Sequence, residues 1–321
     1  MHILALELLI SKSPLNYEEA MSRGSIMPAY FDYDPYDEYE LAREQAEQEK
    51  RDRHFKFVKL KVEEVIAERK VVTDRELKVR LERDFFPWVT GRALNAMARE
   101  GIVRRVGYVG RKTSGKRIPE SFFTLYGTEY NKIIARLEEK RAVSRDINAQ
   151  LTTHAIAGIH AENLFEKAFR ELDFKILGRN VSKFKGKEVK ARVEDKQPPN
   201  LDFIISKDNI TYGVDIKNWI KYEAATRGEI KKKVRCASEL EVVPFIIARY
   251  VDKETIYREF FLKGGICYPY GTLLFPPSLD SLADKARDLL GYPILAVDTL
   301  PKYKVEWIDK LHEDTVKRKK R

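Results

Sequence analysis

The sequence predicts an α/β protein, α+β overall, in which a helical half ending in a β-hairpin precedes a half built on a central mixed β-sheet flanked by helices. Two observations predict this fold class. Residues 55–127 contain three helical segments followed by two strand-like runs, whereas residues 151–312 alternate helical segments with apolar strand-like runs. At 321 residues, the chain is long enough for two domains with separate cores.

These patterns divide the chain into five parts. In chain order they are an acidic, tyrosine-rich leader with a charged helix (1–54), a helix-and-hairpin domain (55–127), a helical linker (128–150), a sheet-containing domain (151–312) and a basic C-terminal tail (313–321). Within the leader we expect an irregular segment at 29–40 and a helix from about Glu40 to Arg53.

The helix-and-hairpin domain shows clear signals for its elements. Residues 55–69 carry the apolar stripe of an amphipathic helix, Thr73 is a natural N-cap for a second helix, and Pro87 opens a third. Two strands follow, at 102–108 and 122–126, and they enclose a basic loop. The predicted order is therefore three helices and then a hairpin.

That order resembles the winged helix-turn-helix fold over residues 55–127. The resemblance implies binding to duplex DNA, with the third helix in the major groove and the hairpin, or wing, on phosphates. The expected DNA contacts are the residues that we place on the outward face of the third helix and the basic residues of the wing: Thr90, Arg92, Asn95, Arg99, Arg111, Lys112, Lys116 and Arg117. Winged helices also serve as protein-interaction modules, but basic side chains on both elements favour DNA.

Two aspartates and a lysine lie inside otherwise apolar strand-like sequence at 200–217. A two-residue turn at 208–209 would join the two runs as a hairpin and place Asp202 opposite Asp215, with Lys217 on the same face. Two facing carboxylates repel each other unless a cation lies between them, and oxygen ligands suit Mg²⁺ or Mn²⁺. The alternative is a solvated sheet face on which Lys217 forms an ordinary surface salt bridge.

A third carboxylate precedes this hairpin. Residues 152–172 form a helical pattern with one broad apolar stripe, and Glu162 lies on the edge of that stripe. A carboxylate that points towards a packed surface is costly unless it is paired. A strand at 174–177 separates this helix from the hairpin; a lysine-rich helix and further strands at 242–250 and 294–297 follow, which gives five strands for the sheet.

This order of helix, three strands, helix and strand, with Asp202 and the Asp215-Ile216-Lys217 tripeptide, resembles the PD-(D/E)xK nuclease superfamily. The resemblance covers roughly residues 150–300. This superfamily has the restriction-endonuclease-like fold, which includes archaeal Holliday-junction resolvases and Mrr-type enzymes. The chain departs from the family pattern at its front, because Asn200 and Leu201 separate the proline from Asp202.

The resemblance implies a catalytic site and a cofactor. Glu162, Asp202 and Asp215 would hold Mg²⁺ or Mn²⁺, and Lys217 would position the attacking water or stabilise the transition state. The residues expected to support this site are Asn218, Glu229 and Lys232. Lys232 or Lys233 is also a candidate phosphate contact, although a solvated basic helix face explains either lysine equally well.

We therefore expect a Mg²⁺-dependent endodeoxyribonuclease, restriction-type or structure-selective, that hydrolyses phosphodiester bonds and acts as a homodimer by analogy with related enzymes. The alternative is a non-catalytic DNA-binding, regulatory or assembly protein that keeps the nuclease fold as a scaffold. In that second case the acidic leader and the segment 264–277 would be docking surfaces.

Composition agrees with a nucleic-acid partner. The formal net charge is +10, which suits a polyanion. The two cysteines, Cys236 and Cys267, have no paired spacing and no histidine cluster near them, so the sequence predicts neither a zinc site nor a disulfide framework. Because no signal peptide or membrane span is recognisable, we expect a cytoplasmic protein with no membrane partner. We also expect a prokaryotic or archaeal origin and no small-molecule substrate.

Overall fold

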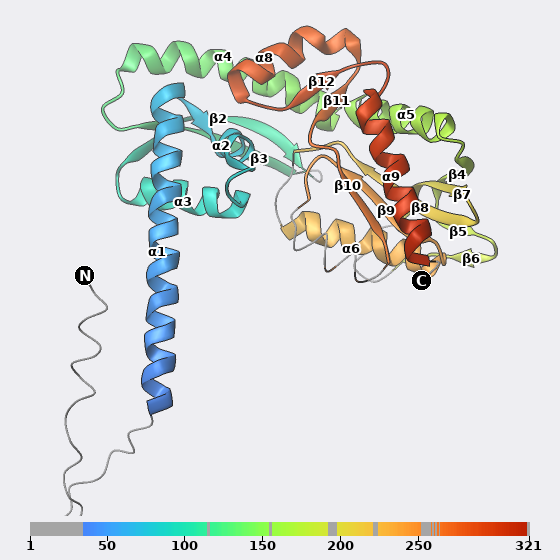
Figure 1. Ribbon diagram of the computed structural model, residues 1–321. Coiled ribbons are helices and arrows are strands. Elements are labelled where there is room, and N and C mark those ends of the chain that lie inside the picture. Colours follow the sequence, from blue (N-terminus) through green and yellow to red (C-terminus); the bar gives the residue numbers. More distant parts are fainter. Residues whose placement is uncertain are drawn as a thin grey trace, which may run out of the picture. The chain divides into compact units, whose positions relative to one another are not determined.

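Figure 1 shows the computed structural model, which describes residues 35–113, 116–153, 156–191, 198–220, 224–251, 258, 260, 262 and 264–319. For residues 35–43, 45, 111–113, 116–118, 152–153 and 224–227 it describes the backbone alone. Chain contacts divide the molecule into two compact units, residues 1–53 and residues 54–321, and each unit is considered by itself below.

The described helices and strands follow one another in a mixed order. They are α1 (Pro35–Arg69), β1 (Val72–Thr73), α2 (Asp74–Leu81), α3 (Pro87–Arg99), β2 (Val103–Thr113), β3 (Lys116–Leu125), α4 (Tyr130–Asn148), α5 (Ile156–Glu171), β4 (Lys175–Val181), β5 (Lys183–Phe184), β6 (Lys187–Glu188), β7 (Leu201–Lys207), β8 (Ile210–Lys217), α6 (Ala224–Glu239), β9 (Val243–Ala248), β10 (Ile266–Pro269), β11 (Leu273–Phe275), α8 (Asp280–Leu290), β12 (Ile294–Ala296) and α9 (Lys302–Lys319). A π-helical turn at Ala149–Thr153 and a 3₁₀ turn at Pro277–Leu279 complete the set. The protein is thus a mixed α/β structure with a central mixed sheet, as predicted, whereas the names of the two fold families stay predictions.

The described part of the first unit is helical. Pro35 stands at the first position of α1, where a proline costs no hydrogen bond. Exposed pairs one turn apart, Glu47 with Arg51 and Gln48 with Asp52, support the helix where it has no core of its own. The two helices expected at 40–53 and 55–69 are parts of this single helix, because no glycine or proline interrupts them.

The second unit begins with a small helical core. Val58, Val62 and Ile66 of α1 are fully buried against α2 and α3. The Thr73 hydroxyl accepts a hydrogen bond of 3.0 Å from the Glu76 amide, which confirms Thr73 as the N-cap of α2. Strands β1, β3 and β2 form an antiparallel sheet behind these helices, and the wing strands extend further along the hairpin than the sequence suggested.

The five-stranded sheet has the order β10-β9-β8-β7-β4. Strands β4, β7 and β8 are antiparallel, whereas β8, β9 and β10 are parallel. The turn at 208–209 has left-handed backbone at both residues, with φ of 50° and 61°, as a type I′ hairpin requires. Phe203 of β7 pairs with Val214 of β8, which confirms the predicted hairpin. Continuing this register by one residue places Asp202 opposite Asp215.

Helices cover both faces of this sheet (Figure 1). Helices α5 and α9 pack on one face, where Phe203, Val214 and Ile216 point into the largest core, as expected. Helix α6 packs on the other face, against Ile204 and Ile246. Asp202 and Asp215 belong to the α6 side, because strand side chains alternate between faces.

One expectation about the end of the domain is wrong. The fifth strand of the central sheet is β10, which pairs with β9, and not the run at 294–297. Strand β12, at that run, pairs instead with β11 in a separate parallel pair. The segment 264–277 contains β10 and β11, and its Tyr268 and Tyr270 rings are buried against Phe165; its role as a docking surface stays a prediction.

The predicted linker is packed on both sides. Ile133 and Leu137 of α4 contact the wing sheet, whereas Val143 and Ile147 pack with α8. Lys140 lies between these groups with no exposed side-chain surface. Helix α4 thus contributes side chains to two hydrophobic cores.

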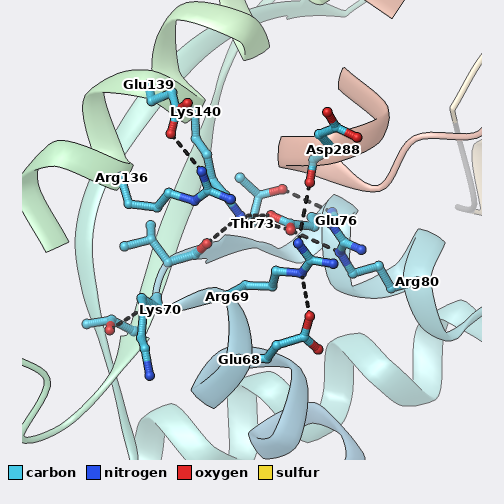
Figure 2. Close-up of polar contacts among 12 residues, drawn as sticks. Glu68, Arg69, Lys70, Thr73, Glu76, Arg80, Arg136, Glu139, Lys140 and Asp288 are labelled. Atoms are coloured by element: carbon cyan, nitrogen blue, oxygen red, sulfur yellow. Dashed lines mark hydrogen bonds and ion pairs between the residues drawn. The ribbon is translucent and has the colours of Figure 1, made fainter. Parts of the chain in front are cut away.

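Lys140 forms a buried ion pair with α2 (Figure 2). Its ammonium group lies 2.8 Å and 2.7 Å from the two carboxylate oxygens of Glu76 and also donates to the Val71 carbonyl. Arg80 approaches the same carboxylate at 3.0 Å. Burial lowers the pKa of Lys140 to about 8, although Glu76 opposes the shift.

Candidate active site

Asp215 is the centre of the candidate site. It follows three apolar residues of β8 and is almost completely buried, with 1% of its surface exposed. The Lys217 ammonium donates to Asp215 Oδ1 at 2.8 Å and lies 2.7 Å from Oδ2, and the Lys233 ammonium lies 2.7 Å from Oδ1. A buried carboxylate is tolerated only when it is paired, and here two cations provide that pairing.

Asp202 lies beside Asp215 at the start of β7. Its carboxylate accepts a 2.6 Å hydrogen bond from the Ile216 amide across the hairpin. Burial and the neighbouring Asp215 charge raise the pKa of Asp202 to about 6, while Lys217 and the amide act in the opposite direction. The predicted repulsion between the facing aspartates is therefore present.

Glu162 reaches the same site from α5. Its side chain is half-buried, with the fully buried Ala161 and Phe165 on the core side of the helix. Burial raises the pKa of Glu162; the Lys217 charge lowers it and the Asp215 charge adds to the increase. The structure thus brings the three predicted carboxylates into one electrostatic neighbourhood.

Lys217 is held as a cation. Burial works against its charge, but Asp215 and Asp202 outweigh that cost and raise the pKa of Lys217. Its ammonium also lies 5.4 Å from the centre of the Trp219 ring, within cation–π range. The ammonium is therefore fixed at the end of β8, beside both aspartates.

The donor set suits Mg²⁺ or Mn²⁺, but the carboxylates are not drawn together into a ligand cage. Among the described residues, no group of three or more histidine, cysteine, aspartate or glutamate side chains is placed to hold a metal ion. Lys217 and Lys233 supply the positive charge next to Asp215 instead. Burial raises the pKa values of Glu162 and Asp202, and the nearby lysines do not fully offset that effect.

The expected supporting residues have different positions. Asn218 is buried and bridges the backbone of α5 and β11, donating to the Ala157 and Leu274 carbonyls. Glu229 is exposed on α6, although its charge contributes to the raised pKa of Lys217. Asn218 thus holds α5 and β11 together behind the site instead of facing it.

Lys233 on α6 pairs with Asp215, whereas the predicted supporting residue Lys232 is half-buried on the same helix. Besides this pair, the Lys233 ammonium donates a 2.6 Å hydrogen bond to the Asn200 carbonyl in front of β7. The helical repeat explains this position, because Lys233 shares the inward face with the buried Ile230 and Ala237. Lys233 lies three residues after Ile230 and four before Ala237, and this helical spacing was the signal in the sequence that Lys233 faces inward.

Replacing Lys233 with methionine is expected to lower the free energy of unfolding by about 2 kcal/mol, because charged hydrogen bonds to a buried carboxylate and a carbonyl are lost. The control is Lys285→Met, which changes an exposed lysine of α8 and is expected to change stability by less than about 0.5 kcal/mol. Urea denaturation measures both. Equal effects would show that Lys233 does not hold Asp215.

Helix α3 presents only part of the predicted DNA-reading face. Arg92, Asn95 and Arg99 are exposed, but Thr90 is completely buried, so the expectation that it faces outward is wrong. Thr90 lies three, four and seven residues before Ala93, Leu94 and Met97, which places it on the inward stripe. The wing side chains Arg111, Lys112, Lys116 and Arg117 lie outside the described residues.

One buried ion pair connects this half of the unit to the candidate site. Arg249 follows β9, and its backbone amide donates to the Lys217 carbonyl at 3.3 Å. Its guanidinium group has no exposed surface and makes two hydrogen bonds, of 2.7 Å and 3.0 Å, to the carboxylate of Glu82 at the end of α2. The end of β8 is thus joined through Arg249 to the turn that precedes α3.

No protein-family model, curated protein or solved structure matches the chain. Every helix in the described ranges is too short or too polar to cross a membrane.

Proposed function

We propose that the protein is a metal-dependent DNA endonuclease that hydrolyses phosphodiester bonds at the Asp202–Asp215 end of the hairpin. The observation that carries this proposal is that Glu162 and Asp202, both with raised pKa values, lie close enough to Asp215 and Lys217 to be influenced by their charges. Perturbed carboxyls gathered at one place are typical of functional sites.

Each residue has a defined task in this proposal. Glu162, Asp202 and Asp215 would hold Mg²⁺ or Mn²⁺, which supplies charge neutralisation at the scissile phosphate and activation of a water when bound. Lys217 would hold the attacking water or offset the negative charge that develops on the phosphate. Lys233 balances the charge of Asp215 and fixes the chain in front of β7 through Asn200.

The rest of the chain suits DNA as the substrate. The formal net charge is +10, and the exposed face of α3 carries two arginines and an asparagine, residue types that contact phosphates and base edges. The order of three helices and a hairpin supports a winged-helix DNA reader. A homodimer, with one site for each strand, is proposed by analogy alone.

A second function has its own supporting observation. Asp215 is already compensated by two lysines, an arrangement that stabilises a fold without any metal. The second candidate is therefore a DNA-binding, regulatory or assembly protein in which the nuclease-like sheet is a scaffold. The two candidates differ in whether DNA is cut.

A cleavage panel separates these functions. Supercoiled plasmid, linear duplex, flap and four-way-junction DNA would be incubated with the protein in Mg²⁺, in Mn²⁺ and in EDTA. We expect strand cleavage with either metal, none in EDTA, and none by Asp215→Ala. Binding without cleavage of any substrate would favour the scaffold, and cleavage that persists in Asp215→Ala would reject the site.

A further inference from the structure

The two oxygens of the Asp215 carboxylate have different surroundings. Oδ1 accepts a 2.8 Å hydrogen bond from Lys217 and also lies 2.7 Å from the Lys233 ammonium. Oδ2 lies 2.7 Å from Lys217, but it is buried and makes no hydrogen bond within the described part of the chain. A buried carboxylate oxygen of this kind is a ligand that suits a divalent cation. The donor atom therefore fits a metal, although two lysines already supply positive charge beside it.

Lys233 acts on all three candidate metal ligands. Burial raises the pKa values of Glu162 and Asp202, and the charge of Lys233 lowers both, as the charge of Lys217 does. The contact with Asp215 adds the third carboxylate to this set. A divalent cation held by the same carboxylates would lie close to a like charge, which weakens its binding. Lys233 and a metal ion therefore compete for the same negative charge.

The two lysines differ in how they are held. Lys217 belongs to β8, as Asp215 does, and its ammonium lies 5.4 Å from the centre of the Trp219 ring. Lys233 reaches the site from α6, and its ammonium has a second, uncharged partner, the Asn200 carbonyl at 2.6 Å. The flexible stem of a lysine allows the ammonium to keep that carbonyl while it moves away from the carboxylate. Lys233 is thus the lysine that can leave Asp215 without losing every partner.

We propose that Lys233 is an internal counter-ion that stabilises the metal-free site and opposes the binding of a divalent cation, so that α6 as well as the carboxylates determines the metal affinity. This inference rests on the proposed function, because the competing ion is the metal of that site. It gives Lys233 the opposite effect to that of a residue that supports the metal ligands. Removal of its charge strengthens metal binding, even though the metal-free protein becomes less stable.

Manganese titration of Lys233 variants tests the counter-ion. Electron paramagnetic resonance would measure free Mn²⁺ in the presence of full-length wild type, Lys233→Met, Lys233→Gln and Lys233→Arg. We expect the two neutral variants to bind Mn²⁺ at least about tenfold more tightly than the wild type, because a nearby positive charge is removed. Arginine keeps the charge, so Lys233→Arg is expected to stay within about threefold of the wild type. Lys285→Met removes the same charge from an exposed position of α8 and controls for net charge.

Stability provides a second measurement. Because an ion that binds the folded state stabilises it, Mn²⁺ is expected to raise the urea midpoint of Lys233→Met by more than that of the wild type. Circular dichroism in EDTA identifies the variants that fold without metal. Lys233→Gln keeps a donor for the Asn200 carbonyl, so it replaces Lys233→Met in both measurements if the methionine variant does not fold.

Weaker Mn²⁺ binding by the neutral variants would show that Lys233 supports the metal ligands and would overturn the counter-ion. Equal affinity of these variants and the wild type would also overturn it but would leave the metal site in place. An equal gain in Lys285→Met would assign the effect to net charge and reject the counter-ion. Binding by none of the proteins would reject the metal site and the counter-ion together. Tighter binding by the neutral variants, with no cleavage of any DNA by the wild type, would support the counter-ion and reject the nuclease alone.

Discussion

Replacing Asp215 with asparagine is expected to remove metal-dependent cleavage, with a fall in single-turnover rate of at least about a thousandfold. The change removes a proposed metal ligand and leaves Lys217 and Lys233 without the carboxylate that separates them. Breaking a buried ion pair from one side costs about 3–5 kcal/mol, so the variant is also expected to be less stable. Cleavage rate and urea midpoint are the two measurements.

Glu162→Gln separates catalysis from folding. The raised pKa of Glu162 means that its ionised form is less favourable in the folded state than in the unfolded chain. That cost appears as pH rises above the ordinary glutamate pKa and is complete once the folded carboxyl is ionised. Glutamine removes it, so the metal-free variant is expected to be at least as stable as the wild type at neutral pH, yet unable to cleave DNA.

Glu162→Gln and Asp215→Asn are expected to differ in stability although both abolish cleavage. Loss of cleavage in a fully folded Glu162→Gln protein supports a catalytic role for the carboxylate. Cleavage at the wild-type rate by Glu162→Gln would remove Glu162 from the site. An Asp215→Asn protein with unchanged stability would contradict the buried ion pairs.

Replacing Lys140 with methionine is expected to lower the free energy of unfolding by about 3–5 kcal/mol. Methionine keeps a buried aliphatic side chain at this position of α4 but removes the ammonium group. The Glu76 carboxylate, which has no exposed surface, is then left paired with Arg80. Because α4 packs on both halves of the second unit, the loss is expected in one cooperative transition. Urea denaturation followed by circular dichroism measures it.

The matched control is Lys132→Met, which removes an exposed ion pair with Glu129 on the same helix. Such a pair contributes less than about 1 kcal/mol. In the double variant Glu76→Leu/Lys140→Met no unpaired carboxylate remains, so much of the stability is expected to return. Equal effects of Lys132→Met and Lys140→Met would contradict the burial of the pair.

The hairpin was predictable because local rules determine it. Left-handed residues at 208–209 select the tight turn, and the two-residue period then places Asp202, Asp215 and Lys217 on one face. Helix α5 was predictable from its apolar stripe, which also marked Glu162. These features depend on residues close together in the sequence.

The features that were missed depend on contacts between distant segments. Strand β10 contains a proline and belongs to the sheet only because β9 lies beside it. In the sequence Lys140 is one of many charged residues of the predicted linker. Its burial depends on the contact with Glu76 of α2, which lies far away in the sequence. The position of Thr90 is a different case, because its spacing from Leu94 and Met97 already indicated an inward direction.

Manganese binding tests the central claim most directly, because it requires no knowledge of the DNA substrate. Electron paramagnetic resonance of free Mn²⁺ would be titrated with wild-type protein and with Glu162→Gln. We predict a site in the wild type whose affinity increases as pH rises through about 6, where Asp202 loses its proton, and which Glu162→Gln weakens by at least about tenfold. No binding by the wild type, or equal binding by both proteins, would contradict a metal site at these carboxylates.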